Sequence, residues 1–260
     1  MKTLVLDRLR KWQQKFLARA GYVIFNTRSN HCYARDGLFT FNNDGFREDP
    51  GFKAAYERGV KASAGFDPRI EWRIHVALWV ARTASRIPGD FVECGVNAGF
   101  TSSAIMQRLN WCSIDKTFYW IDTFNGPVLT QYSQMEVKLG RRRVAEQAVA
   151  REAYVTNLDL VRANYAEWPN VEIVQGAVPD VLPALGIERV AFLHLDMNCA
   201  YPERAALEHF WHLLSPCAMV LLDDYAYYGN EYLAQAIDSA ASSLGTEVLS
   251  LPTGQGLIVK

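Results

Sequence analysis

Cysteine is scarce in this sequence, and its placement suits neither a disulfide framework nor a structural zinc site. Five cysteines are scattered over 260 residues, their number is odd, and none belongs to a Cys-x-x-Cys pair. Disulfide-stabilised secreted domains and zinc sites both need closely spaced cysteines. The pattern therefore predicts free thiols in a reducing cytoplasm.

A surplus of charge of one sign and long apolar runs are also absent. The formal net charge is −1, so no overall field attracts nucleic acid or acidic membranes. No run approaches the roughly 20 apolar residues of a membrane span, and no signal peptide pattern is present. We expect no nucleic-acid partner and no stable membrane anchoring.

The composition is that of a folded protein with an N-terminal extension. Half of the residues are hydrophobic and 12% are aromatic, which is enough for a full core. Residues 2–20 have the spacing of a basic amphipathic helix, and docking on the protein itself or on a second subunit is favoured over a membrane-surface anchor. Residues 21–60 are expected to be irregular, with Pro50 among the breakers, and to form a lid or a subunit contact.

Apolar segments alternate regularly after a helix expected at residues 70–87. Strands are expected at residues 91–95, 117–122, 171–175, 190–196 and 218–223, and helices at residues 101–109, 202–214 and 232–244. Two of the strands are almost wholly apolar, which is typical of a parallel sheet covered on both faces. Residues 247–251 and 256–259 form a hairpin-like pair. The sequence thus predicts an α/β, doubly wound, mostly parallel sheet with a terminal antiparallel hairpin.

The first expected strand ends in a glycine-containing loop, residues 93–99, which reads ECGVNAG. This pattern is neither the dinucleotide GxGxxG nor a Walker A loop. It suits a cationic nucleoside without phosphates, because Glu93 can lie near a positive charge. Asp122 ends the next strand, where an acid can accept hydrogen bonds from both ribose hydroxyls. The alternatives are a loop that only turns the chain and an aspartate that caps a helix.

Two later strands also end in aspartates, namely Asp196 and the pair Asp223 and Asp224. Three carboxylates at one sheet edge repel one another unless a divalent cation such as Mg²⁺ lies between them. Such a metal would lower the pKa of a substrate hydroxyl, and Asp196 could take its proton. The alternative is that the acid pair caps a turn. His194 lies on the same strand face as Asp196, as a substrate contact, a second base or a satisfied buried histidine.

These segments together resemble the macrocin O-methyltransferase (TylF-type) family. The resemblance rests on residues 91–96 (FVECGV), 121–126 (IDTFNG), 175–177 (QGA), 195–196 (LD) and 222–225 (LDDY), and it covers roughly residues 88–260. It implies a class I methyltransferase fold with a seven-stranded sheet, S-adenosylmethionine as methyl donor and Mg²⁺-dependent methylation of a sugar hydroxyl on a natural product. It also implies a homodimer or larger oligomer. Residues 1–68 would then form the N-terminal helix and lid or oligomerisation segment, and residues 69–260 the methyltransferase domain.

The resemblance also assigns residues to the site. Asp196, Asp223 and Asp224 would bind the metal, Asp196 would be the base, and His194 is a second catalytic candidate. The expected cofactor-binding set is Glu93, Gly95, Val96, Asn97, Gly99, Thr101, Ser102, Asp122, Thr123, Phe124, Gly176, Ala177 and Asp196, with adenine near the glycine and alanine at 176–177. The family's Asp-Gly-Asp-x-Tyr stretch is replaced here by DMNCAY at residues 196–201.

Other functions compete with this interpretation. One is a metal-independent methyltransferase that acts on an amine or another acceptor. Another is a non-catalytic scaffold that acts through residues 1–60. A nucleotide-dependent oxidoreductase is disfavoured, because GxGxxG is missing.

Overall fold

The computed structural model describes residue 12, residues 15–22 and residues 32–260. Contacts divide the chain into a unit that ends at Asp44 and a larger unit, Gly45–Lys260. The boundary expected after residue 68 between a lid segment and a catalytic domain stays a prediction. Among the described residues, we find no helix that combines the length and the apolar character needed to cross a membrane.

The N-terminal unit contains a short hairpin. Strands β1 (Tyr33–Arg35) and β2 (Leu38–Thr40) pair antiparallel. Asp36 and Gly37 between them both have positive φ, 50° and 70°, which is the geometry of an Asp-Gly hairpin turn. Residue 12 and residues 15–19 are helical, and the rest of the helix expected at residues 2–20 lies outside the described residues.

The larger unit begins with the 3-10 helix η1 (Gly45–Glu48) and with α2 (Pro50–Ala62). The expectation of irregular structure is wrong here. Asp49 caps α2 by accepting a hydrogen bond from the Phe52 amide at 2.7 Å, and Pro50 occupies the first turn, where its missing N–H costs nothing. Asp-Pro thus starts this helix.

One seven-stranded sheet organises the larger unit, in the order β5-β4-β3-β6-β7-β9-β8. The first five strands in this order run parallel, and β9 and β8 are antiparallel additions. This confirms the expected class I methyltransferase architecture with its terminal hairpin. The strands are β3 (Asp90–Cys94), β4 (Phe118–Asp122), β5 (Val171–Gln175), β6 (Val190–Leu195), β7 (Leu214–Leu222), β8 (Leu249–Ser250) and β9 (Gly256–Val259).

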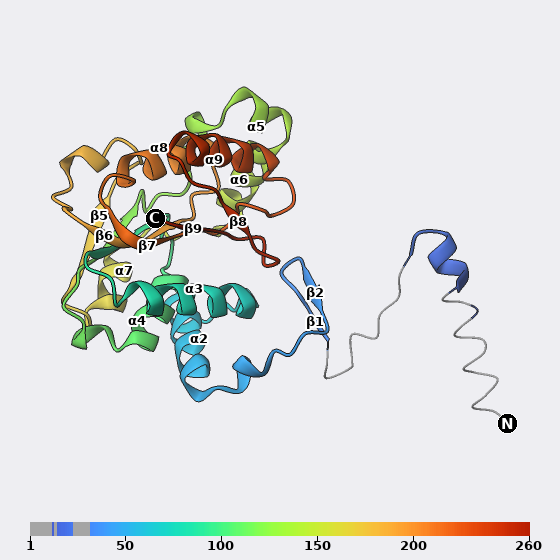
Figure 1. Ribbon diagram of the computed structural model, residues 1–260, viewed down its shortest axis with the longest axis horizontal. Helices are drawn as coiled ribbons and strands as arrows, with labels where there is room; N and C mark the ends of the chain where they lie inside the picture. Colours follow the sequence, from blue (N-terminus) through green and yellow to red (C-terminus); the bar gives the residue numbers. More distant parts are fainter. Residues whose placement is uncertain (1–11, 13–14, 23–31) are drawn as a thin grey trace. The chain divides into compact units, whose positions relative to one another are not determined.

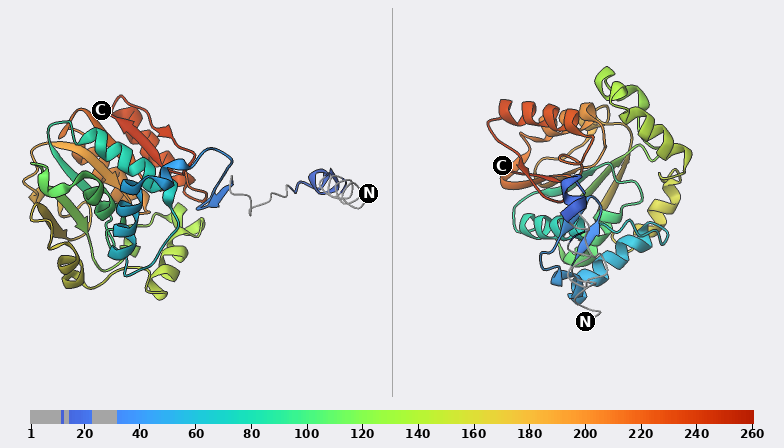
Figure 2. Two further views of the ribbon diagram at one scale, coloured as in Figure 1. Left: turned by 90° about the horizontal axis from the view of Figure 1, so that it is seen from below. Right: turned by 90° about the vertical axis from the view of Figure 1, so that its right-hand side faces the viewer.

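Helices cover both faces of this sheet, and Figures 1 and 2 show the resulting layers. One apolar cluster joins the sheet to α2, α3, α4 and α7, and a second joins it to α8 and α9. Strand β6 is buried along its whole length, as its continuous apolar sequence predicts. The helices are α3 (Glu71–Ala84), α4 (Phe100–Leu109), α5 (Gln134–Lys138), α6 (Arg141–Ala150), α7 (Leu158–Tyr165), α8 (Ala200–Phe210) and α9 (Glu231–Ser243), with short turns η2 (Trp111–Ser113), η3 (Leu129–Gln131) and η4 (Leu182–Ala184).

The boundary between α8 and β7 differs from its prediction. The helix expected to reach Leu214 ends at Phe210, and Leu214 instead begins β7. An inward apolar residue fits a helix and a strand equally well, so periodicity alone could not place this boundary.

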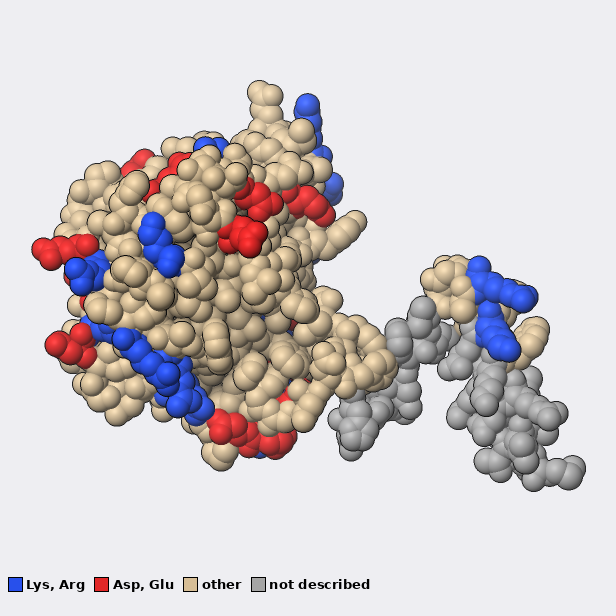
Figure 3. Space-filling view, viewed as in Figure 1, with Lys and Arg blue, Asp and Glu red and all other residues tan. Residues whose placement is uncertain are grey.

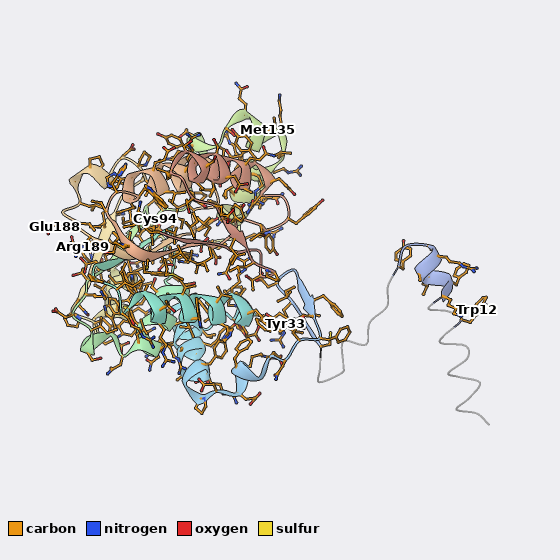
Figure 4. All side chains as sticks on the ribbon, viewed as in Figure 1. Trp12, Tyr33, Cys94, Met135, Glu188 and Arg189 are labelled. Carbon is orange, nitrogen blue, oxygen red and sulfur yellow. The ribbon has the colours of Figure 1, made fainter. Side chains whose placement is uncertain are left out.

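The segment between β4 and β5 carries α5, α6 and α7. Met135 on α5 is 47% exposed, whereas Cys94 at the end of β3 is fully buried, and both are labelled in Figure 4.

Basic and acidic side chains both occur on the face of the larger unit seen in Figure 3, with uncharged surface between them.

Candidate active site

A pocket lies beyond the carboxyl ends of the parallel strands, where β3 has β4 on one side and β6 on the other. Open α/β sheets bind ligands at such a switch point. Seven of the predicted site residues line this pocket: Gly95, Asn97, Asp122, Thr123, Gly176, Ala177 and Asp196. The remaining predicted residues do not line it: Glu93, Val96, Gly99, Thr101, Ser102, Phe124, His194, Asp223 and Asp224.

Asp122 at the end of β4 holds the glycine loop in place. Its Oδ2 accepts hydrogen bonds from the amides of Val96 at 2.7 Å and Asn97 at 2.8 Å. Its Oδ1 accepts from the Phe124 amide at 2.7 Å and only weakly from the Thr123 hydroxyl, at 3.4 Å. A carboxylate oxygen can accept two hydrogen bonds. Oδ1 therefore keeps capacity for a ligand hydroxyl.

Two glycines of the loop are required by the protein's own packing. Gly95 has φ 90°, and a Cβ there would collide with the Asp196 backbone. Gly99 has φ 75°, and a Cβ there would collide with the Tyr165 hydroxyl, which donates to the Ala98 and Gly99 carbonyls. The glycine spacing thus has a structural cause in addition to any contact with a ligand.

Glu93 and His194 form a buried pair beneath the loop. Glu93 is 2% exposed and accepts from the Ser102 hydroxyl, and its other oxygen lies 3.0 Å from His194 Nδ1. Burial alone would lower the pKa of His194, because it disfavours the charged imidazolium. The neighbouring acids Asp223 and Glu93 have the larger opposite effect, so the pKa of His194 is raised well above its ordinary value. Only Nδ1 has a hydrogen-bond partner, because His194 Nε2 lies 3.7 Å from Asp223 Oδ1, and the role of His194 stays a prediction.

Asp196 is the one acid of the predicted metal set that lines the pocket. It follows β6, and Asn198 Nδ2 donates to its Oδ1 at 3.2 Å. Burial raises the pKa of Asp196 well above its ordinary value, and the negative charges of Asp223 and Asp224 raise it further. A carboxylate with a raised proton affinity is a suitable general base.

Glu203 supports the backbone next to Asp196. Its Oε1 accepts from the amides of Met197 at 3.0 Å and Asn198 at 2.8 Å. The residue is fully buried, and this burial together with Asp224 raises the pKa of Glu203 to about 8.

Asp223 and Asp224 follow β7 and are bridged by Arg73 from α3. Arg73 is 7% exposed, and its Nη1 lies 2.7 Å from Asp223 Oδ2 and 2.8 Å from Asp224 Oδ1. Gln255 donates to the other oxygen of Asp223 at 2.9 Å. Burial opposes ionisation of Asp223, but Arg73 and His194 outweigh it and lower its pKa. Burial and Asp223 raise the pKa of Asp224.

This arrangement does not fit the predicted magnesium site. Mg²⁺ needs free carboxylate oxygens at about 2.0–2.1 Å in octahedral geometry. Both oxygens of Asp223 and one of Asp224 already accept hydrogen bonds from nitrogen donors. In the part of the chain that the structure describes, no group of three His, Cys, Asp or Glu side chains has metal-binding geometry.

Hydrogen bonds fasten the β4–β5 connection to the glycine loop and to the start of α8. Asn97 Nδ2 donates to the Ala153 carbonyl at 3.2 Å, and its Oδ1 accepts from the Val155 amide at 2.8 Å. Glu136 on α5 accepts from the Ala200 amide, at the start of α8, at 2.9 Å. The β4–β5 connection, part of which lines the pocket, therefore has identifiable attachment points.

Sequence reasoning missed Arg73, Glu203 and Gln255. A detectable signal existed for Arg73, which shares a helix stripe with the buried residues Ala77, Val80 and Ala84. An arginine in a buried apolar stripe predicts a buried acid as its partner, because a buried charge is costly unless it is paired. Gln255 and Glu203 had no comparable signal, because their partners come together only in the fold.

Comparison with known sequences supports the expected family. A family model described as macrocin O-methyltransferase (TylF) matches residues 75–242. The 8-demethyl-8-(2,3-dimethoxy-alpha-L-rhamnosyl)-tetracenomycin-C 4′-O-methyltransferase of Streptomyces olivaceus is 29% identical over 151 residues, which are 55% of this chain and 55% of that protein. The mycinamicin III 3″-O-methyltransferase of Micromonospora griseorubida is 26% identical over 146 residues, 54% of this chain and 56% of that protein. The chain thus spans about half the length of these curated relatives.

Solved structures confirm the fold. The O-methyltransferase NovP has a TM-score of 0.64 at 18% identity, over 84% of this chain and 99% of that chain. The TDP-rhamnose 3′-O-methyltransferase CalS11 from calicheamicin biosynthesis has a TM-score of 0.52 at 13% identity, over 84% of this chain and 96% of that chain. With its matching family model and class I fold, the chain belongs to the macrocin O-methyltransferase (TylF) family.

Proposed function

We propose that this protein is an S-adenosylmethionine-dependent O-methyltransferase that acts on a hydroxyl of a sugar or another polyhydroxylated small molecule. One observation carries the proposal: Asp196, an acid with raised proton affinity, lines the same pocket as the glycine loop and Asp122. The names of the two curated relatives support the acceptor class: both are O-methyltransferases, one acting on a rhamnosylated tetracenomycin and the other on mycinamicin III.

The pocket lining fits the methyl donor. Asp122 Oδ1 has room for a ribose hydroxyl. Gly176 and Ala177, which follow β5, line the pocket together with the apolar residues Ile121 and Val178, and this lining suits a flat base. Glu93 and Ser102, which are hydrogen-bonded to each other beneath the glycine loop, support this loop and do not line the pocket. When bound, the donor supplies an electrophilic methyl group on a sulfonium.

The protein's own residues then provide base catalysis and shielding. Asp196 accepts the proton of the acceptor hydroxyl while the oxygen attacks the methyl group. Asn198 and Glu203 fix the loop that carries Asp196. Asn97 and Glu136 hold the β4–β5 segment over the pocket, which excludes water. Magnesium, which the sequence predicts, has no part in this proposal because Arg73 engages the two acids.

Donor binding and acceptor class can be tested separately. Purified protein is titrated calorimetrically with S-adenosylhomocysteine, and methyl transfer from labelled S-adenosylmethionine is then measured on deoxysugar glycosides, phenols and amines. Saturable one-to-one binding with transfer to glycosides supports the proposal. Transfer to amines alone would favour the other acceptor class, and the absence of binding at tens of micromolar would favour the scaffold.

The oligomeric state and the cellular location are further parts of the proposal. A homo-oligomer in the cytoplasm follows from the resemblance and from the free cysteines. Exposed apolar side chains on α5 and α6, including Val137 and Val144, support a subunit contact. Light scattering during size-exclusion chromatography measures the mass in solution, and a monomer would contradict the oligomer.

A further inference from the structure

Arg73 lies where a cation is needed, between two adjacent acids at the end of β7. A single nitrogen, Nη1, approaches three oxygens: Asp223 Oδ2 at 2.7 Å, Asp224 Oδ1 at 2.8 Å and the Asp223 carbonyl at 3.3 Å. A cage of oxygens around one positive centre is the arrangement that a hard metal ion otherwise demands. In this chain the positive centre belongs to a side chain.

The surroundings keep the guanidinium in this position. It packs over the Tyr227 ring, 4.9 Å from the ring centroid, and α3 as a whole packs against β7. The remaining Asp223 oxygen is held by Gln255 at 2.9 Å and lies 3.7 Å from His194 Nε2. A divalent cation would have to displace a buried, permanently charged arginine from these oxygens.

The third acid, Asp196, faces the pocket rather than the guanidinium. Asp196 lines the pocket, whereas Asp223 and Asp224 do not. Position 198, where the family pattern has another aspartate, is an asparagine that donates to Asp196. This protein therefore has one carboxylate fewer next to Asp196 than the family pattern has. The loss of that carboxylate weakens the attraction of this site for a divalent cation.

We propose that the Arg73 guanidinium takes the place of the divalent cation, so that this protein binds its donor and acts without a bound metal. Arg73 is then a positioning residue. It fixes the two acids behind Asp196 and neutralises part of their charge, but it offers no open coordination position to an acceptor. The statement about catalysis rests on the proposed function, and the statement about metal binding does not.

The test measures metal binding directly. Free Mn²⁺ is quantified by electron paramagnetic resonance in titrations of the full-length protein with and without S-adenosylhomocysteine. The wild type is compared with Arg73→Met, which keeps the apolar stem and removes the charge. Arg82→Met is the matched control, because Arg82 is exposed on the same helix. Arg73→Lys keeps the positive charge but replaces the planar guanidinium by an ammonium group.

We expect no stoichiometric Mn²⁺ site in the wild type, Arg73→Lys or Arg82→Met, and about tenfold or greater tightening of Mn²⁺ binding in Arg73→Met, because two buried carboxylates lose their counter-charge. Circular dichroism checks that each variant folds. If Arg73→Met does not fold, the wild-type titration alone still decides whether this protein has a metal site. One tightly bound Mn²⁺ per wild-type chain, lost in Asp224→Asn, would overturn the proposal.

Activity supplies a second readout that separates the two proposals. Methyl transfer by the wild type should be unchanged by EDTA or added Mg²⁺. Loss of transfer with EDTA and recovery with Mg²⁺ would overturn the role of Arg73 while leaving the methyltransferase proposal intact. Failure to bind S-adenosylhomocysteine would instead contradict the methyltransferase proposal, and the Mn²⁺ result would still stand by itself.

Discussion

The backbone amide of Asn97 donates a hydrogen bond to the Asp122 carboxylate at 2.8 Å, which ties the glycine loop after β3 to the end of β4. The Val96 amide makes the same contact at 2.7 Å. The carboxylate therefore shapes the glycine loop from the protein side.

Replacement of this carboxylate should weaken donor binding. We expect Asp122→Ala to lower the affinity for S-adenosylhomocysteine roughly 10- to 100-fold, because hydrogen bonds to a charged group contribute about 1.5–3 kcal/mol each. Isothermal titration calorimetry measures the change, with exposed Asp115→Ala as the control. Unchanged affinity in Asp122→Ala would remove Asp122 from the cofactor site.

Asp196→Asn should separate donor binding from turnover. Without its base the enzyme should lose about 10²- to 10⁴-fold in kcat, while S-adenosylhomocysteine binds almost as before. Because the pKa of Asp196 is raised, the wild-type rate should increase with pH as the carboxyl loses its proton, above the range of an ordinary aspartate. Steady-state rates over a pH series check both points, and full activity of Asp196→Asn would exclude Asp196 as the base.

Asn97→Ala should loosen the β4–β5 segment. The substitution removes two hydrogen bonds, to Ala153 and Val155, and we expect about tenfold faster hydrogen exchange at residues 153–155, equivalent to about 1.4 kcal/mol of local stability. Mass spectrometry of peptic fragments reports the exchange. Gln107→Ala, exposed on α4, is the control. Equal protection in Asn97→Ala and the wild type would show that other contacts hold the β4–β5 segment.

Glu203→Gln should change the pH dependence of stability. The pKa of Glu203 is about 8 in the folded protein against an ordinary value of 4.5, so the folded state holds the proton more tightly than the unfolded chain. That contribution to stability is complete below about pH 4.5 and is lost as the pH rises to about 8. We expect the glutamine variant to lose less stability between pH 5 and pH 8 than the wild type, by on the order of 2 kcal/mol.

Urea unfolding at several pH values measures this difference. Glu208→Gln is the matched control, since Glu208 is exposed on the same helix, α8. If Glu203→Gln and the wild type lose equal stability over this pH range, the carboxyl of Glu203 is ionised in the folded protein at neutral pH.

Much of the fold could be predicted from the sequence, because strands buried on both faces consist of continuous apolar residues. Strand β6 is the clearest case. Helix α2 was missed because Asp49-Pro50 signals both a loop and a helix start, and only the following residues decide between them. The end of α8 was misplaced because Leu214 is apolar in either structure.

The pocket was predicted better than the chemistry behind it. Asp122 and Asp196 were found because each ends a parallel strand, and topology brings such ends together. The same rule placed Asp223 and Asp224 nearby, but it carried no information about the residues that approach from a helix. Arg73 lies 150 positions away from Asp223 in sequence, and its role is set by how α3 packs against the sheet.

The contact between Gly99 and Tyr165 has a consequence for the history of the family. The space for a side chain at position 99 is already filled by the Tyr165 hydroxyl, which binds the carbonyls of the same loop. A side chain at position 99 therefore has no room while Tyr165 is kept. Relatives that carry a larger residue at the position of Gly99 should have lost the tyrosine at the position of Tyr165, so the two sites are expected to covary across the lineage.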